Sequence, residues 1–314
     1  MTLFIQTPRN DRVIASLGPY RRHLDALTGA GTNIQRRLSR GGLANYEPDL
    51  QATLLALAQS RSQRVFYDVG AHIGLFSALL TSVYRGTGLQ AFAFEPTPST
   101  FQRALQMRDK NHLSYAFQPC ALSNNVGTTQ LYLSTKAETS NSLNSEFRSG
   151  STAIDVRCET IDSVVEAGLP APTLIKIDVE TFEPQVIIGG SRTIERHKPW
   201  ISCEFLGDTD EGDLETSLVF LDGLGYGFHQ ISPTVPWEKL DRAAVLRRRS
   251  SKAGSRDWLV APKPLSPSFF KRFRSWRRAI GKCGLKSNVK TDDKLVRKQL
   301  RSRLWEPSGS GAAD

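Results

Sequence analysis

The chain has 314 residues, long enough for a large domain with a buried core, and its composition is ordinary for a globular protein. It contains no apolar run of the roughly 20 residues that span a bilayer, and its start lacks the basic leader and apolar segment of a secretory signal. The four cysteines are scattered without a Cys-x-x-Cys pair, which is typical of free thiols in a reducing compartment. We therefore expect a cytoplasmic protein.

The positive charge is confined to the end of the chain. The formal net charge is +10, and residues 263–314 alone contain 14 Lys or Arg against 4 Asp or Glu. The first 262 residues are therefore neutral overall, so the basic character does not describe the partner of the main domain. We predict three parts: an N-terminal helical extension over 1–45, a main domain over 46–262, and a basic, partly helical or disordered tail over 263–314.

Short strands alternate with helices throughout the main domain. The pattern predicts a helix from Pro48, strands at 64–69, 89–95, 113–122, 128–134, 153–159, 173–179, 200–206, 226–231 and 257–262, and further helices at 75–84, 99–110, 160–167 and 184–195. Because strands and helices of this length alternate, we expect parallel strands in one sheet with helices on both faces, which is an α/β fold.

The first strand of this series is joined to its helix by DVGAHIG, residues 68–74. In a parallel sheet, ligands bind at the carboxyl ends of the strands, where a helix amino terminus offers free N–H groups. Gly70 and Gly74 would allow a ligand to pack directly on the backbone. Asp68 would attract a cationic part of that ligand, and Glu95, at the end of the second strand, could accept both hydroxyls of a ribose.

Two classes of ligand use such a junction. A dinucleotide needs Gly-x-Gly-x-x-Gly so that its pyrophosphate reaches the helix terminus, but His72 and Leu75 stand at the second and third glycine positions. A ligand without phosphates fits better, and the two glycines with the two carboxylates together suit S-adenosylmethionine. A nicotinamide-dependent oxidoreductase remains the less favoured alternative.

Eight motifs between Tyr46 and Pro262 resemble those of one known family, the FkbM-type methyltransferases, and occur in the same order. They are YEPDL (46–50), DVGAHIG (68–74), FEPTPSTF (94–101), ALSNNVG (121–127), ETIDSVV (159–165), LIKIDVETFEPQVIIGG (174–190), KPWISCEF (198–205) and DWLVAP (257–262). Two positions depart from the family pattern. His72 stands where the family usually has Asn, and Thr181 stands where it usually has Gly.

The resemblance implies a class I methyltransferase fold. This fold is a Rossmann-like three-layer sandwich with a mostly parallel, seven-stranded sheet whose last strand is antiparallel. Many members of the family methylate hydroxyls on sugars of glycans, glycolipids or natural products. We therefore expect an S-adenosylmethionine-dependent O-methyltransferase with a small-molecule or glycan acceptor. A nucleic acid acceptor is not expected, because the sequence has no Asn-Pro-Pro-Tyr or Asp-Pro-Pro-Tyr run.

Carboxylates after the fourth and fifth strands of the predicted sheet are the catalytic candidates. Asp178 is the predicted base, because a sugar hydroxyl is a poor nucleophile until its proton is removed. Glu180 follows two residues later, so the pair could instead share a divalent cation or order the loop. Glu204 is a further candidate, with burial beside Lys176 or a helix terminus as its alternative role. Histidine spacing predicts no metal site.

Other residues are assigned to the site by their position alone. Ala121 and Leu122 end the third strand, where the adenine ring is expected, and His72 is expected near the methionine end of the cofactor. Tyr46 and Glu47 could cover the site or only start a helix, and Thr181 is expected beside the acceptor. The Ser- and Asn-rich segment 140–151 is predicted to be a loop that could lie over the acceptor.

The tail contains two candidate helices. Ser266 and Pro267 favour the start of the first helix and Gly281 its end. Aromatic and apolar residues share one face of this helix with cations opposite, which is typical of a helix lying on an anionic membrane: Phe269, Phe273, Trp276 and Ile280. A second helix is predicted near 291–304. The predicted location is then the inner membrane surface. The alternatives are a solvated tail, RNA binding by a non-catalytic module, and helices packed on the catalytic domain.

Overall fold

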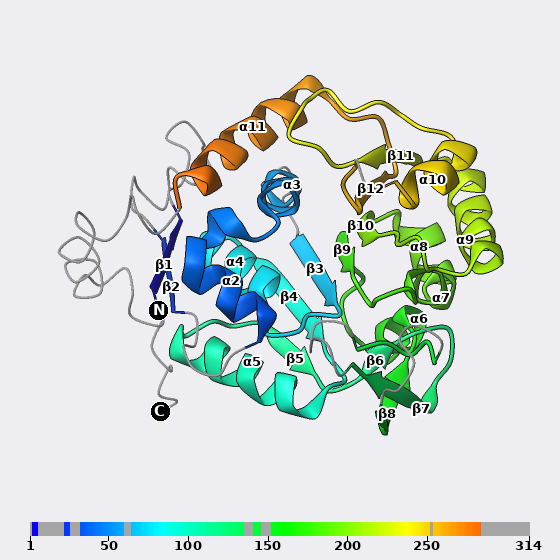
Figure 1. Cartoon of the computed structure of the whole chain (residues 1–314), viewed down its shortest axis with the longest axis horizontal. Helices are drawn as coiled ribbons and strands as arrows, with labels where there is room; N and C mark the ends of the chain where they lie inside the picture. Colours follow the sequence, from blue (N-terminus) through cyan, green and yellow to red (C-terminus); the bar gives the residue numbers. More distant parts are fainter. Residues whose placement is uncertain are drawn as a thin grey trace, which may run out of the picture.

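The computed structural model describes residues 2–5, 22–25, 32–59, 64–134, 141–145, 152–251 and 254–283. Its centre is a seven-stranded sheet (Figure 1). In spatial order the strands are β11 (Gly227–Gln230), β12 (Asp257–Ala261), β10 (Trp200–Glu204), β9 (Leu174–Ile177), β3 (Arg64–Val69), β4 (Leu89–Phe94) and β5 (Ala116–Gln118).

The strand directions agree with the class I methyltransferase fold. Strand β3 pairs in parallel with β4 and β9, and the same direction continues to β5 on one side and β10 on the other. Strand β12, the last of the sheet in the sequence, is antiparallel to both β10 and β11. The predicted fold class is therefore confirmed.

Helices cover both faces of the sheet and enclose two apolar cores. One face is covered by α2 (Asn33–Gly41), η1 (Leu43–Asn45), α3 (Pro48–Ala58), α4 (Leu75–Val83), α5 (Pro98–Lys110) and α11 (Pro267–Gly281). The other is covered by α6 (Ile161–Glu166), α7 (Glu183–Gly189), α8 (Ser191–His197), α9 (Glu211–Gly223) and α10 (Arg242–Arg249). Alternation along β3 supplies both cores, since Phe66 packs in the first core while Tyr67 and Val69 pack in the second.

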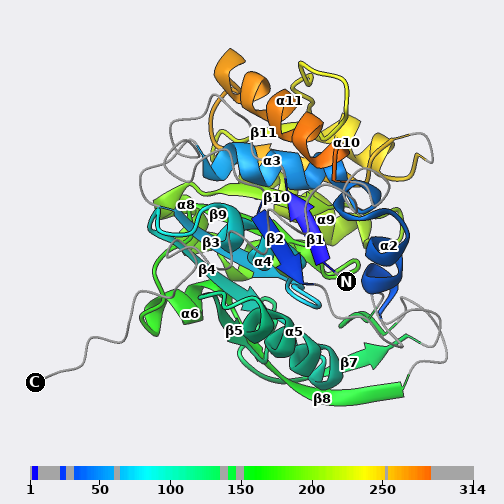
Figure 2. The same cartoon turned by 90° about the vertical axis from the view of Figure 1, so that its left-hand side faces the viewer.

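Two smaller sheets complete the described part. Strands β6 (Ala121–Leu122), β8 (Thr152–Glu159) and β7 (Gly127–Leu133) form one sheet in that order, and Figure 2 shows β7 and β8 side by side at the lower side of the molecule. Strands β1 (Thr2–Ile5) and β2 (Arg22–Asp25) pair antiparallel, so the extension that we predicted to be helical also contains strands.

Two predicted elements are interrupted. The strand expected over 113–122 is divided into β5 and β6, which belong to different sheets, at a point where Pro119 cannot donate to a ladder. The helix expected over 184–195 is divided into α7 and α8 at Gly190. Helices α9 and α10 were not predicted.

Helix α11 occupies the predicted residues but not the predicted environment. Its start is capped by Ser266, and its aromatic face is buried in the first core against α3 and Trp237, whose ring centroid lies 4.9 Å from that of Phe273. The expectation that this face lies on a membrane is wrong, because Phe273 and Trp276 have no exposed surface. Packing on the catalytic domain, one of the alternatives, is what the structure shows. The second candidate helix lies outside the described residues, and the three-part division of the chain stays a prediction.

Within the described ranges, no helix is both long enough and apolar enough to cross a membrane.

Candidate functional site

A cleft opens where β3, β4 and β9 end. Its empty volume is about 670 Å³, including the part that is open to solvent. Eight of the predicted site residues line this cleft: Tyr46, Gly70, His72, Glu95, Ala121, Leu122, Asp178 and Glu180. Five do not: Glu47, Asp68, Gly74, Thr181 and Glu204. The ends of three strands and a short piece of the N-terminal region therefore meet at one place, as predicted from the sheet.

Glu95 joins two loops at the floor of the cleft. Its side chain is 6% exposed, and its two carboxylate oxygens accept hydrogen bonds from the backbone N–H groups of His72 at 2.9 Å and Thr97 at 2.8 Å. Burial raises the pKa of Glu95, against the effect of these hydrogen bonds. Because each oxygen has a second lone pair, the carboxylate can also accept hydrogen bonds from a ligand.

The two glycines of the junction are required by the protein itself. Gly70 has φ +70°, and a Cβ there would lie 1.9 Å from the carbonyl oxygen of Asp178. Gly74 has φ +74°, and a Cβ there would lie 2.8 Å from the Tyr115 hydroxyl. We expected a ligand to pack on this bare backbone. Gly70 lines the cleft and Gly74 does not, and at both positions a left-handed conformation and close contacts with Asp178 or Tyr115 exclude larger residues.

Asp68 lies behind the cleft and already has a cation from the protein. Its side chain is fully buried, and Oδ2 accepts hydrogen bonds from the Ser77 N–H at 3.0 Å and the Ser77 hydroxyl at 2.8 Å. Its Oδ1 lies 3.8 Å from Lys176 Nζ. Asp68 therefore positions the first turn of α4 and pairs with Lys176, rather than presenting a carboxylate to a cationic ligand.

His72 presents an unpartnered imidazole to the cleft. It is 9% exposed, and among the described residues neither ring nitrogen has a hydrogen-bond partner. Burial lowers the pKa of His72 to about 4, so the ring is neutral at pH 7. Its φ of +50° is left-handed, a region that Asn tolerates well. The neutral ring offers one donor and one acceptor to a bound molecule.

Asp178 is held in the cleft wall by a buried lysine. Lys176 Nζ lies 3.2 Å from Asp178 Oδ2 and donates to the Gly70 carbonyl at 3.3 Å. Burial works against the charge of Lys176, which is 3% exposed, but Asp178 and Asp68 outweigh it and raise the pKa of Lys176. The Asp178 side chain itself is 27% exposed. It is therefore an oriented carboxylate with access to a ligand.

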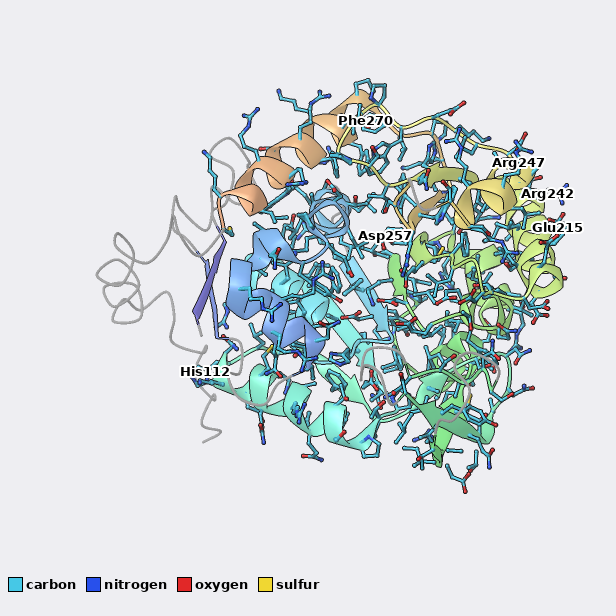
Figure 3. The ribbon with its side chains drawn as sticks, in the orientation of Figure 1. His112, Glu215, Arg242, Arg247, Asp257 and Phe270 are labelled. Atoms are coloured by element: carbon cyan, nitrogen blue, oxygen red, sulfur yellow. The ribbon has the colours of Figure 1, made fainter. Side chains whose placement is uncertain are left out.

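Glu204 has both a cationic and an anionic neighbour, and Nη1 of the cation, Arg256, lies 3.9 Å from Glu204 Oε1. The register of β10 and β12 places Glu204 directly opposite Asp257, which Figure 3 labels, and like charges in such a pair repel. Burial, followed by Asp178 and Asp257, raises the pKa of Glu204 to about 10. Burial, followed by Asp178, raises the pKa of Asp257 to about 7. A carboxyl group that retains its proton at pH 7 and does not line the cleft is a poor candidate for the base.

Glu47 and Thr181 lie at the edges of the site in left-handed conformations. Glu47 has φ +41°, and burial, followed by Asp257 and Asp178, raises its pKa to about 8. Thr181 has φ +80° and is 3% exposed. Neither is a lining residue, so each could influence a ligand only through its neighbours.

For a metal ion shared by Asp178 and Glu180, the described residues offer no third side-chain ligand of the His, Cys, Asp or Glu type. In the part of the chain that the structure describes, no group of three or more His, Cys, Asp or Glu side chains is arranged to bind a metal.

Several lining residues were not singled out individually in the sequence. They are Ile34, Thr97, Leu131, Asn141, Ser142 and Leu143. Asn141, Ser142 and Leu143 belong to the polar segment 140–151, which we predicted to be a loop that could lie over the acceptor. Lys176 was named only as a neighbour of Glu204, although its place before Asp178 in LIKIDVE was a visible signal.

The cleft fits an adenosyl group in its chemistry. Apolar side chains of Phe94, Ala121 and Leu122 lie beside the Glu95 carboxylate, so a flat ring and a diol have matching partners. The orphaned nitrogens of His72 offer hydrogen bonds to the polar end of the same molecule.

A comparison with protein families decides the identity. Residues 68–229, just over half of the chain, match the methyltransferase FkbM domain. The chain belongs to this family. Residues 68–229 of this FkbM-domain protein therefore form a domain of a methyltransferase family.

One curated relative and two solved structures illustrate what the FkbM-domain protein is similar to. Hexuronic acid methyltransferase AglP of Haloferax volcanii is 30% identical over 142 residues, which are 45% of this chain and 56% of AglP. The chain thus spans little more than half the length of this relative. A methyltransferase FkbM from Methylobacillus flagellatus KT is 18% identical with a TM-score of 0.42, over 63% of this chain and 44% of that one. An O-methyltransferase from Thermotoga maritima is 11% identical with a TM-score of 0.35, over 70% and 66%.

Proposed function

We propose that this methyltransferase methylates a hydroxyl on a sugar, as part of a glycan, a glycolipid or a natural product. The observation that carries the proposal is Asp178, a partly exposed carboxylate in the cleft wall. Its Oδ2 is paired with Lys176, which leaves Oδ1 as the oxygen that could accept a proton. A sugar hydroxyl needs such a base, whereas positioning alone supplies much of the remaining rate.

The residues of the cleft have separate proposed roles. When bound, S-adenosylmethionine supplies an electrophilic methyl group. Glu95 would accept hydrogen bonds from the ribose hydroxyls, and the neutral His72 ring would bind the polar end of the cofactor. Asp178 would take the proton of the acceptor hydroxyl at Oδ1, while the Lys176 ammonium pairs with Oδ2 and fixes the orientation of this carboxylate. Glu180 lines the same wall and would contact the acceptor.

The similarity to AglP supports a sugar as the acceptor class, because AglP is a hexuronic acid methyltransferase. A hexuronic acid offers both hydroxyl and carboxyl oxygens, so the class of sugar does not decide which group is methylated. We propose the hydroxyl because a carboxylate acceptor is already deprotonated and would not need the base in the cleft wall.

The proposal can be tested with the purified full chain and S-adenosylmethionine labelled in its methyl group. The acceptors would be methyl glycosides of neutral hexoses, hexuronic acids and amino sugars. Transfer to oxygen would be located by fragmentation in a mass spectrometer, and mild alkali would then separate products, since it cleaves methyl esters but not methyl ethers. An alkali-stable ether supports the proposal. Products that are only esters or methylamines would refute it.

We further propose that the outer face of α11 binds an anionic membrane surface by charge alone. Lys271, Arg274 and Arg278 are exposed along this face and form no ion pair with another described residue. Some cations on other elements are instead paired, as in Arg242 with Glu215 at 2.8 Å, both labelled in Figure 3. Each cation near an anionic leaflet contributes about 1 kcal/mol, so a row of them supports salt-dependent adsorption.

The membrane proposal has a matched test by co-sedimentation with vesicles that contain phosphatidylglycerol. A variant with all three cations of the α11 row changed to Glu should pellet less than the wild type at low salt. The control reverses three exposed cations on other elements, with the same change in net charge: Arg196, Lys239 and Arg247. Equal pelleting of the two variants would show an effect of net charge only, and would overturn the proposal.

A further inference from the structure

Residues 141–145, which we call the strap, cross the cleft and are bound on both sides. On the side of Glu95, the Asn141 side-chain amide donates to the Thr97 hydroxyl at 3.2 Å. On the side of β9, the Ser142 hydroxyl donates to the Glu180 carbonyl at 2.6 Å. Backbone hydrogen bonds in both directions also join Ser142 to Tyr132 of β7. The strap therefore connects the cofactor side of the cleft to the wall that contains Asp178.

The polar side chains of the strap are used to hold it in place. The Ser142 hydroxyl accepts a hydrogen bond from the Asn144 N–H at 3.1 Å while it donates to the Glu180 carbonyl. The Asn141 side-chain oxygen accepts from the Ser134 N–H at 2.9 Å. These groups order the strap itself, although Asn141, Ser142 and Leu143 also line the cleft.

One further contact comes from a residue in an unfavourable conformation. Thr181 is buried with φ +80°, a region that a β-branched side chain rarely adopts because it is strained there. Its hydroxyl accepts a hydrogen bond from the Asn144 side-chain amide at 3.1 Å. A glycine would adopt this φ without strain, but it has no hydroxyl to offer. The threonine is therefore strained at this position, but it makes a hydrogen bond to the strap that a glycine could not make.

We propose that Thr181 is a positioning residue that fixes the strap to the loop after β9. The strap and this loop then open together when a ligand enters or leaves. The net value of one neutral hydrogen bond corresponds to about a two- to tenfold change in an equilibrium constant. Loss of the Thr181–Asn144 contact should therefore raise the open fraction of the strap by this factor, and S-adenosylhomocysteine should dissociate faster by a similar factor.

Substitutions at Thr181 separate the hydroxyl from the backbone strain. Thr181→Ser keeps the hydroxyl, Thr181→Val keeps the branching without it, and Thr181→Gly removes both. Asn144→Ala removes the partner amide. The control is Asn125→Ala, which removes an exposed side-chain contact to Asn124 outside the cleft.

Two measurements on the full chain report how readily the strap opens, and neither needs an acceptor. Hydrogen exchange of the peptide covering the strap gives its opening, and stopped-flow displacement gives the dissociation rate of S-adenosylhomocysteine. We expect exchange and dissociation about two- to tenfold faster in Thr181→Gly, Thr181→Val and Asn144→Ala, and unchanged in Thr181→Ser and Asn125→Ala. The variant with both Thr181→Val and Asn144→Ala should be no faster than either single variant.

Thermal unfolding of the same variants distinguishes fixation of the strap from general packing. Thr181→Gly relieves strain, so its strap should loosen without a matching decrease in unfolding temperature. Thr181→Val keeps the strain, so its strap should loosen and its unfolding temperature should also decrease. If Thr181→Ser loosens the strap as much as Thr181→Gly, or if Asn144→Ala leaves exchange unchanged, the proposal is overturned. Faster exchange in β3 as well as in the strap would equally overturn it. Because the probe is the cofactor product, these outcomes do not depend on the identity of the acceptor.

Discussion

Replacement of Glu95 should weaken cofactor binding and also loosen two loops, and the structure allows the two effects to be separated. Glu95→Gln keeps the size of the side chain but replaces one acceptor oxygen by an NH₂ group. That group would face the N–H of either His72 or Thr97, which both now donate to the carboxylate. One buried hydrogen bond is therefore replaced by two donors facing each other.

The magnitude follows from the charge of the acceptor. Hydrogen bonds to a charged group contribute about 1.5–3 kcal/mol, so loss of the ribose contacts should raise the Kd of S-adenosylhomocysteine about 10- to 150-fold. An unsatisfied buried N–H costs about 1–3 kcal/mol in addition, and this cost lowers the free energy of unfolding. Glu95→Ala would leave two such N–H groups, so Glu95→Gln is the better variant.

The assay is calorimetric titration with S-adenosylhomocysteine, accompanied by urea unfolding of each variant. Asp162→Asn is a matched control, because Asp162 is also buried and accepts backbone hydrogen bonds from Arg192 at 3.2 Å and Thr193 at 2.8 Å, but it does not line the cleft. We expect both variants to lose stability and only Glu95→Gln to lose affinity. A folded Glu95→Gln variant with wild-type affinity, or an equal loss of affinity in the control, would refute the role of Glu95.

Three further predictions concern the acids and the imidazole of the site. Asp178→Asn removes the proposed base, so kcat should fall about 100-fold or more with little change in S-adenosylhomocysteine affinity; recovery of a chelator-inactivated enzyme by Mg²⁺ would favour the metal alternative. Burial lowers the pKa of His72 from 6.5 to about 4, so the unfolded state takes up the proton first as the pH falls. Measured relative to His72→Asn, the stability of the wild type in urea should therefore drop by roughly 3 kcal/mol between pH 6.5 and 4, and identical pH profiles for the two proteins would contradict this assignment. Burial and neighbouring carboxylates raise the pKa of Glu204 to about 10, so stability should fall as the pH rises from 4.5 toward 10. Because Glu204→Gln stays neutral, its free energy of unfolding should decrease less over that range. Parallel curves of stability against pH for the two proteins would argue against a protonated Glu204.

Local pattern was sufficient for the sheet and for the approximate position of the site. Residues that point to one face of a strand recur with period two, and DVGAHIG, FEPTPSTF and LIKIDVE each include the end of an apolar strand. Since parallel strands end at one edge, Gly70, Glu95 and Asp178 could be expected to meet without knowledge of the fold in detail. The leucines of α9 at 214, 218 and 221 also have helical spacing, so this missed helix was within reach of the same argument.

The partners of the site residues could not be obtained in this way. That Asp68 pairs with Lys176, and that Glu204 lies opposite Asp257, depends on the registers of β3 with β9 and of β10 with β12. Register is set by contacts between segments far apart in the chain, so no local pattern contains it. The requirement for glycine at position 70 has the same origin, since the carbonyl that excludes a side chain belongs to Asp178.

Helix α11 shows the same limit for a surface. Its residues determine that one face is apolar and aromatic and the other cationic, and they determine where the helix begins and ends. They do not determine what covers the apolar face, because a membrane and a protein core both exclude water from that face and therefore stabilise the same amphipathic pattern. Only the tertiary structure, in which α3 and Trp237 cover that face, decided that the helix packs on the catalytic domain.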